Sequence, residues 1–407
     1  MNTALKKARI LLPAKGVAPE KWAVVACDQF TAQPEYWKEV ETVVGGAPST
    51  LNLTLPEVYL ADSDRRVPQI HAAMRDYLER GVLTEAVDGF VLVERTTPAG
   101  VRPGLVAALD LEQYDPSSGS NSLIRATEGT VASRVPPRAR IRSGAPLELP
   151  HAMMLIDDPQ RMVVETLYEN RDRLRPLYDF ELMLNGGHLR GWAVEGADAD
   201  RVFRIMDLLA RDANGLLYAV GDGNHSIAAA KQCWTQIRGE LTEAERESHP
   251  ARYALVELIN LHCPALVFEP VHRILFNVDS AMVLGELRRW LSERGVADAP
   301  GDDLIVFDAD MRMNFRFEQY PLPLLQSFLD SYLARHPEAD IDYIHGEEAL
   351  RTLVARHPGS LGFMPRAFDK AELFPSIRRW GALPRKSFSM GEATDKRYYM
   401  EARKIQE

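Results

Sequence analysis

The chain has 407 residues, of which 46% are hydrophobic and 26% charged, and its formal net charge is −10. This composition predicts a folded protein with a sizeable core, in two or three domains, and argues against disorder. The acidic charge also argues against a general nucleic-acid binder, because such binding is driven by the neutralisation of phosphates.

The first third of the chain predicts a mixture of helices and strands. Helices are expected where apolar residues recur every three or four positions, and strands where they alternate or cluster between turn formers. In chain order these patterns predict a strand within 22–30 that ends at Asp28, helices over 34–45 and 66–83, and paired strands over 88–97 and 102–114. A polar connection over 115–144 follows, and a compact domain seldom carries so long a loop without a function.

The rest of the chain continues this mixture. The patterns predict a strand within 151–159, a helix over 200–212, a strand, turn and helix over 215–241, two strands over 252–278, and a new series of helices and strands over 281–366. We therefore expect an α+β protein with mixed β-sheets and flanking helices. The new series predicts a main domain over 1–279, and a C-terminal subdomain over 280–407 whose tail packs back on the main domain.

Neither a membrane nor an oxidising compartment is indicated. The basic N-terminus lacks the apolar core and the cleavage site of a signal peptide, and no apolar run reaches about 18 residues. The three cysteines have no paired spacing, so neither a disulfide framework nor a CxxC zinc site is expected. We expect a cytoplasmic protein with no membrane partner.

The most informative stretch is 221–226, Gly-Asp-Gly-Asn-His-Ser, between an apolar strand and an alanine-rich helix. The N-terminus of a helix offers unpaired main-chain N–H groups and a positive dipole end, which suit a phosphate, and glycines let the main chain approach it closely. Asp222 offers a carboxylate for a metal ion or a hydroxyl proton, and His225 can donate to a phosphoryl oxygen or act as an acid. The structural alternative is that Asn224 caps the helix, Asp222 makes a turn bond and His225 has no role.

Four short segments, in the same order along most of the chain, resemble the motifs of the bacterial and archaeal DUF1015 family of unknown function. Members carry Asp-Gly-His-His-Arg where this chain has 222–226, His-Glu-x-Thr where it has 127–130, a Pro-Tyr-Asn-Arg segment where it has 269–275, and a Lys-Ser-Thr/Phe segment where it has 384–392. Three residues depart from this pattern: Asn224 and Thr127 each replace a histidine, and Ser226 replaces an arginine. The chain therefore resembles a variant branch, and the effect of the departures on its chemistry stays open.

The strand, turn and helix also resemble the phosphate-binding turn of the ParB/sulfiredoxin class, which includes segregation proteins, sulfiredoxins and free-serine kinases. This resemblance implies a ParB/sulfiredoxin-like core. Sulfiredoxin chemistry needs a cysteine where this chain has Asn224, and the segregation proteins use an arginine where it has Ser226. A small-molecule kinase needs a carboxylate near the acceptor hydroxyl and donors around the phosphates, and this stretch offers both.

The polar connection adds further candidate residues. Glu128 can take a hydroxyl proton, Arg125 can clamp a phosphate, and Thr130 follows in the same loop; the alternative is a solvated loop with an Arg–Glu pair. The segment 134–142 holds four arginines, which either attract an anion or guard the exposed edge of a strand.

Three residue pairs complete the candidate set: His188 and Arg190, His272 and Arg273, and Lys386 and Ser387. The first pair is expected on one side of a strand that follows a glycine turn. The second is either a structural ion-pair element or part of a site. The third can hold a phosphate without forming a Walker loop, or it is part of a solvated tail.

Together these residues predict a nucleotide-dependent phosphotransferase that acts on a small hydroxyl-bearing metabolite, with Glu128 as base and Asp222 and His225 at the reacting phosphoryl group. The residues expected to hold phosphates are Gly223, Asn224, Ser226 and Lys386. Mg²⁺ is expected to arrive with ATP or another nucleotide and to use Asp222. Two alternatives stay open, a non-catalytic nucleotide or metabolite sensor and a metal-dependent hydrolase built on Asp222, His225 and His188. The acceptor, the nucleotide and the oligomeric state are not specified by the sequence.

Overall fold

The computed structural model describes residues 2–25, 34–117, 119–150, 152–296, 299–391 and 396–406. They form two compact units. The first contains the residues up to 267 together with 374–382 and those from 391 onward, and the second contains 268–373 and 383–390. This division differs from the expected boundary at Asp279, because the strand that starts at Phe268 pairs with strands of the second unit.

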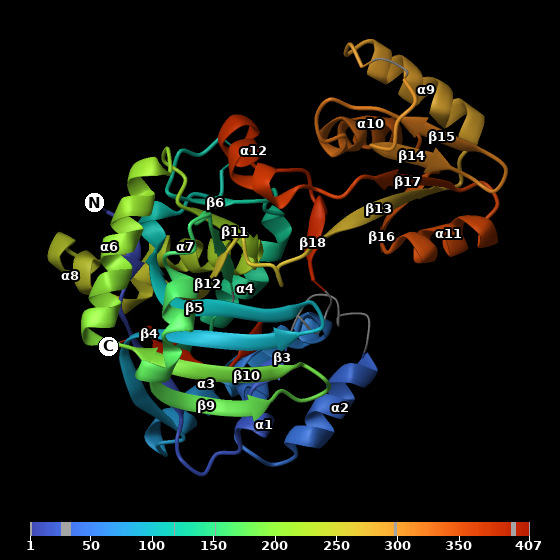
Figure 1. The fold of residues 1–407 in the computed structure, drawn as a ribbon. Coiled ribbons are helices and arrows are strands. Elements are labelled where there is room, and N and C mark those ends of the chain that lie inside the picture. Colours follow the sequence, from blue (N-terminus) through green and yellow to red (C-terminus); the bar gives the residue numbers. More distant parts are fainter. Residues whose placement is uncertain are drawn as a thin grey trace. The chain divides into compact units, whose positions relative to one another are not determined.

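The first unit is built on a 12-stranded mixed sheet of the described residues (Figure 1). Its main path runs through β6 (Ile124–Ala126), β11 (Tyr218–Asp222), β8 (Met153–Ile156), β12 (Tyr253–Asn260), β5 (Gly100–Asp110), β4 (Leu83–Thr97), β2 (Ala8–Pro13), β20 (Ala402–Lys404) and β7 (Leu147–Glu148). Off this path, β1 (Leu5–Lys6) pairs with β5, β10 (His188–Val194) pairs with β4, and β9 (Arg175–Glu181) pairs with β10. The expected hairpin of β4 and β5 is confirmed.

Two strand pairs of this sheet, β6 with β11 and β8 with β12, are parallel, and the other pairs are antiparallel. The expected α+β class with mixed sheets is therefore confirmed. The long strands β5, β4, β10 and β9 lie side by side in Figure 1.

The helices of the first unit are α1 (Pro19–Trp22), α2 (Pro34–Val44), α3 (Ser63–Glu79), α4 (Val135–Arg142), α5 (Val164–Glu169), α6 (Gly196–Asp212), α7 (Asn224–Arg238), α8 (Glu243–Ser248) and most of α12 (Leu373–Trp380). The predicted helices over 34–45, 66–83 and 200–212 are confirmed as α2, α3 and α6. The strand-edge alternative for the arginine segment is wrong, because that segment forms α4, whose prolines occupy its first turn. No helix among the described residues is long and apolar enough to cross a bilayer.

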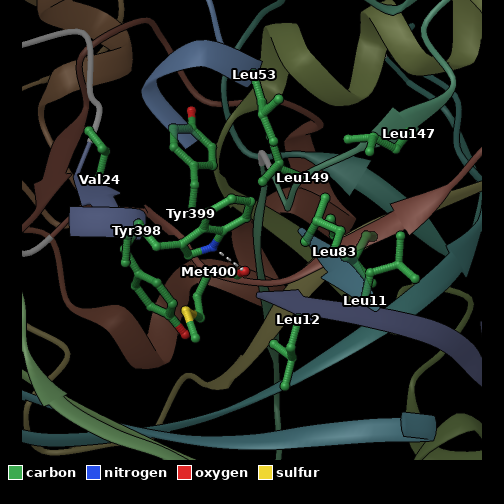
Figure 2. Packing of buried hydrophobic residues seen from close by; sticks show 14 of the residues in the cluster. Leu11, Leu12, Val24, Leu53, Leu83, Leu147, Leu149, Tyr398, Tyr399 and Met400 are labelled. Carbon is green, nitrogen blue, oxygen red and sulfur yellow. Dashed lines mark hydrogen bonds between the residues drawn. The ribbon is translucent and has the colours of Figure 1, made fainter. Parts of the chain in front are cut away.

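The C-terminal residues close the core of the first unit. The strand β19 (Tyr398–Tyr399) pairs with β3 (Val24–Val25), and β20 pairs with β2 and β7. The buried indole of Trp22 donates a 3.0 Å hydrogen bond to the main-chain oxygen of Met400, drawn as a dashed line in Figure 2. The predicted strand within 22–30 is thus confined to Val24–Val25 in the described part of the chain, and Asp28 lies outside the described residues.

The second unit is a six-stranded antiparallel sheet with helices of its own, again counted over the described residues. Its elements are β13 (Phe268–Phe276), α9 (Ser280–Ser292), β14 (Leu304–Phe307), β15 (Arg312–Phe315), α10 (Leu322–Arg335), β16 (Asp340–His345), α11 (Glu347–Arg356), β17 (Leu361–Pro365) and β18 (Phe388–Met390). The central strand β13 pairs with β16, β17 and β18.

Candidate functional site

Two parallel strands bring the predicted acid–base residues to one edge of the large sheet. In the register of β6 and β11, Ile124 lies opposite Tyr218 and Ala126 opposite Val220. Since parallel strands end at the same edge of a sheet, the loop that carries Glu128 starts beside the turn that carries Asp222.

Two hydrogen bonds hold this loop against the turn. The buried hydroxyl of Thr127 donates to the carbonyl oxygen of Val220 over 2.7 Å. The main-chain N–H of Val131 donates to Nε2 of His225 over 3.2 Å. Glu128 therefore lies between two points that are both fixed to the Asp222–His225 turn.

Gly223 shapes the turn. Its φ of 92° and ψ of 26° lie in the left-handed region, which favours glycine, and it occupies the N-cap position of α7 without a capping side chain. Ser226 and Ile227 donate their N–H groups to the carbonyl oxygen of Gly223. The preceding N–H groups at the start of a helix have no intrahelical acceptor, so they are suited to an anion.

Asn224 is the first helical residue rather than the cap, so the structural alternative in which it caps α7 is wrong. Its Oδ1 atom is buried and has no hydrogen-bond partner among the described residues. His225 accepts the hydrogen bond from Val131 with Nε2, so in the neutral form of the ring the proton is on Nδ1.

Arg397 completes the turn from the far end of the chain. Its Nε atom lies 3.6 Å from Oδ2 of Asp222, and its side chain is only 9% exposed. Sequence reasoning missed this residue, although the predicted return of the tail to the main domain was a signal for it. The ion pair places a positive charge beside the Asp222 carboxylate at the start of α7.

A cavity of about 130 Å³ opens beside the first two turns of α7. Arg397 and Ser226 line it, and so do Ile227 and Ala230. Its apolar walls include Trp37, Leu53, Leu55, Met74, Leu147 and Leu149. The predicted phosphate-binding residue Ser226 thus lies both in the turn and in the cavity wall.

The arginines of α4 are engaged with carboxylates. Arg138 forms an ion pair with Glu57, and Arg142 forms one with the buried carboxylate of Glu148. Both arginines line the cavity together with their partners. This pairing leaves the α4 side of the cavity with little net charge.

Arg125 does not reach the turn. Its guanidinium donates to the main-chain oxygens of Ser122 and Gly215, both over 3.0 Å. These two residues precede β6 and β11, at the opposite ends of the strands from Asp222. The expectation of a phosphate clamp at Arg125 is therefore contradicted by the geometry. Thr130 does follow in the Glu128 loop, with its hydroxyl oxygen buried.

His188 and Arg190 lie together on β10, as predicted, but they contact a separate group of carboxylates. The two ring nitrogens of His188 lie 2.6 Å from carboxylate oxygens of Glu181 and Asp179. Arg190 contacts Asp179 and Glu94. Burial lowers the pKa of His188. The two carboxylates raise it by more than burial lowers it, so the pKa lies above its usual value.

The other four candidates belong to the second unit. Arg273 is fully buried in β13 and donates to the main-chain oxygens of Arg385 and Lys386. The hydroxyl of Ser387 donates to the oxygen of Pro384. Burial, with Arg273 nearby, lowers the pKa of His272 to about 4. The contacts of Arg273 and Ser387 thus support the 383–390 segment through main-chain oxygens rather than through the expected ion pair. Ser387 is buried, so the alternative of a solvated tail is wrong for this residue.

The metal-dependent hydrolase has no support in the described part of the chain. Among those residues, no group of three or more histidine, cysteine, aspartate or glutamate side chains is arranged to hold a metal ion. His188 is bound to carboxylates of its own hairpin, so it does not join Asp222 and His225.

The comparisons with known proteins agree with the motifs. The model of the family described as "Protein of unknown function (DUF1015)" matches residues 11–352. No curated protein matches the chain.

Several solved structures share a low overall likeness. A free serine kinase in complex with AMP is 11% identical, with 74% of this chain and 92% of that chain covered and a TM-score of 0.41. A conserved hypothetical protein from Pyrococcus furiosus is 10% identical, with 72% and 90% covered and a TM-score of 0.36. SbnI with a C-terminal truncation, from Staphylococcus aureus, is 7% identical, with 70% and 82% covered and a TM-score of 0.37. These TM-scores are too low to carry a functional conclusion, and the ParB/sulfiredoxin-like core stays a prediction.

Proposed function

We propose that this chain, which belongs to the DUF1015 family, is a nucleotide-dependent phosphotransferase that acts on a small hydroxyl-bearing metabolite. One observation carries the proposal. The parallel ends of β6 and β11 bring the Glu128 loop to the Asp222–His225 turn, at the N-terminus of a helix that begins with a left-handed glycine.

Each group at this corner has a role in phosphoryl transfer. Glu128 takes the proton of the acceptor hydroxyl. The hydroxyl oxygen forms a bond to the terminal phosphorus of the nucleotide. The bond between that phosphorus and the bridging oxygen breaks at the same time. The first N–H groups of α7 and Nδ1 of His225 donate to the phosphoryl oxygens. Since phosphoryl transfer depends mainly on positioning and charge stabilisation, no covalent intermediate is required.

The donor set also suits magnesium. Mg²⁺ commonly uses one or two carboxylates together with phosphate oxygens, and Asp222 ends β11 while Glu128 lies in the loop bonded to that strand. Asp222 would hold the ion, and the ion when bound would neutralise charge on the phosphates. Arg397 lies 3.6 Å from the same carboxylate and would balance part of its charge.

The test is nucleotide consumption against a panel of alcohols and hydroxy acids, with nucleotide binding measured separately by calorimetry. We expect Glu128→Gln and Asp222→Asn to lower turnover by about 100-fold or more, in the range typical of general-base and electrostatic groups, while the fold is retained. Glu240→Gln is the matched control, because Glu240 is an exposed carboxylate on the same unit. Normal turnover in both site variants would refute the proposal.

A second candidate, a non-catalytic sensor of nucleotides or metabolites, is favoured by Thr127. The family pattern has a histidine at this position. Threonine has no titratable group, and the hydroxyl of Thr127 donates to the carbonyl oxygen of Val220, so this residue cannot transfer a proton as a histidine can. Nucleotide binding without any product across the same panel would favour the sensor.

A further inference from the structure

We propose that the cavity beside α7 binds an apolar group of the acceptor, about the size of a benzene ring, so that the substrate class is an alcohol with one compact apolar moiety. This inference rests on the proposed phosphotransferase function. It adds the chemical character of the acceptor, which the turn by itself does not specify.

The size of the cavity supports this class of ligand. Its volume is about 130 Å³, and an apolar cavity of about 150 Å³ holds a benzene molecule in another protein. Protein interiors are normally close-packed, so an opening of this size beside a candidate site indicates a place for a ligand. A bicyclic purine is larger than benzene, which argues against a nucleobase as the occupant.

The walls have the matching chemistry. Leu53, Leu147, Leu149 and Tyr399, all labelled in Figure 2, come from three separate segments and line the cavity. Trp37 adds an aromatic surface and is 1% exposed. A nucleobase needs partners for its polar edges, whereas the α4 arginines in the wall are already paired with carboxylates.

Two residues of the cavity wall adjoin the reacting corner. Ser226 lines the cavity and follows His225 directly, and Arg397 lines it while contacting Asp222. An apolar body in the cavity would therefore direct an attached hydroxyl toward the Asp222–Glu128 edge. Ala229 and Ala230 of the same helix also line the cavity, and their small side chains leave room for a ligand.

The probes are benzyl alcohol and cyclohexylmethanol, with glycerol as a polar alcohol of small size. Binding is measured by calorimetry with the full chain, and ADP binding and ATP-dependent product formation are measured on the same samples. We expect the two apolar alcohols to bind and glycerol to bind more weakly by about ten-fold or more, a difference of about 1.4 kcal/mol.

Ala230→Leu fills the cavity, and we expect it to weaken benzyl alcohol by about ten-fold or more while ADP affinity is unchanged. Ala228→Leu is the control, because Ala228 is a buried alanine of α7 outside the cavity wall. Should Ala230→Leu fail to fold, Met74→Ala enlarges the cavity instead and is expected to favour 2-naphthylmethanol over benzyl alcohol.

The outcomes separate the two proposals. Binding of apolar alcohols that depends on residue 230, without product, leaves the cavity inference standing and refutes the phosphotransferase. Phosphorylation of glycerol by a chain that binds neither apolar alcohol overturns the cavity inference and leaves the phosphotransferase standing. Binding of benzyl alcohol that is the same in wild type, Ala230→Leu and Met74→Ala also overturns the inference.

Discussion

The hydroxyl of Thr127 donates a 2.7 Å hydrogen bond to the carbonyl oxygen of Val220, and this bond joins the loop of Glu128 to the strand that ends at Asp222. The two residues are 93 positions apart in the chain and meet because β6 and β11 are parallel neighbours. The bond lies at the last register pair of these strands, where the sheet stops and the turn begins. The relation of the proposed base to the proposed phosphate site therefore depends on a threonine at a position where the family pattern has a histidine.

Thr127→Val tests this bond, since valine keeps the shape of threonine without its hydroxyl. A buried carbonyl oxygen would lose its side-chain donor, so we expect the free energy of unfolding to fall by about 1–2 kcal/mol. We also expect turnover to fall more than nucleotide affinity, because the Glu128 loop loses its anchor while the α7 amides stay in place. Urea unfolding and calorimetry measure the two effects, and an unchanged midpoint would show that the bond does not hold the loop.

Gly223→Ala tests the left-handed N-cap. Its φ of 92° costs an L-residue about 1–2 kcal/mol, so the variant should unfold at lower denaturant concentration. Gly285→Ala is the control with the opposite sign, because Gly285 lies within α9, and a Cβ added there meets no atom within 4 Å. We expect that control to gain roughly 0.5–1 kcal/mol. Equal shifts in both variants would contradict the assignment.

Glu148 links four elements of the first unit. Its Oε1 accepts 2.9 Å hydrogen bonds from Leu255 N–H and from Nε of Arg403, and Arg142 pairs with Oε2. Burial raises the pKa of Glu148. The two arginines lower it by more than burial raises it, so the carboxylate stays ionised. Glu148→Gln would leave two guanidiniums without their buried counter-charge, and we expect a loss of about 3–5 kcal/mol. Chemical denaturation at pH 7 measures it, with Glu240→Gln as reference, and a loss below about 1 kcal/mol would show that water or other groups compensate.

Glu401 predicts a pH dependence of stability. Its side chain is fully buried, and burial, with a contribution from Glu257, raises its pKa from 4.5 to about 7 against the opposing hydrogen bond from Tyr178. Between pH 4.5 and about 7, Glu401 is protonated in the folded state and ionised in the unfolded state. The free energy of unfolding therefore decreases as the pH rises through this range. The decline is on the order of 3 kcal/mol.

Glu401→Gln keeps the size of the side chain and removes this titration. We expect the variant to melt at a higher temperature than wild type at pH 8 and to show a much smaller difference at pH 5. Thermal unfolding at the two pH values checks this. A difference that does not change with pH would mean that Glu401 does not titrate in this range.

Several parts of the fold followed from local patterns. The periodicity of 34–45, 66–83 and 200–212 predicts α2, α3 and α6 because helix faces are set by residues three and four apart. Helical periodicity could also have predicted the structure of the arginine segment 134–142. Arg134, Arg138 and Arg142 recur every four residues, a helical spacing that the strand-edge alternative overlooked.

In the candidate site, too, some features follow from the local sequence and others depend on the tertiary structure. The order strand, glycine turn, helix is local, so the sequence by itself determined that Asp222 and His225 stand at the start of α7. Only the tertiary structure decided that the Glu128 loop lies beside them, that Arg125 faces the other ends of the strands, and that Arg397 reaches Asp222 from the C-terminal segment. The physical reason is that strand partners and register depend on how the whole sheet buries its faces, which no short stretch of sequence encodes.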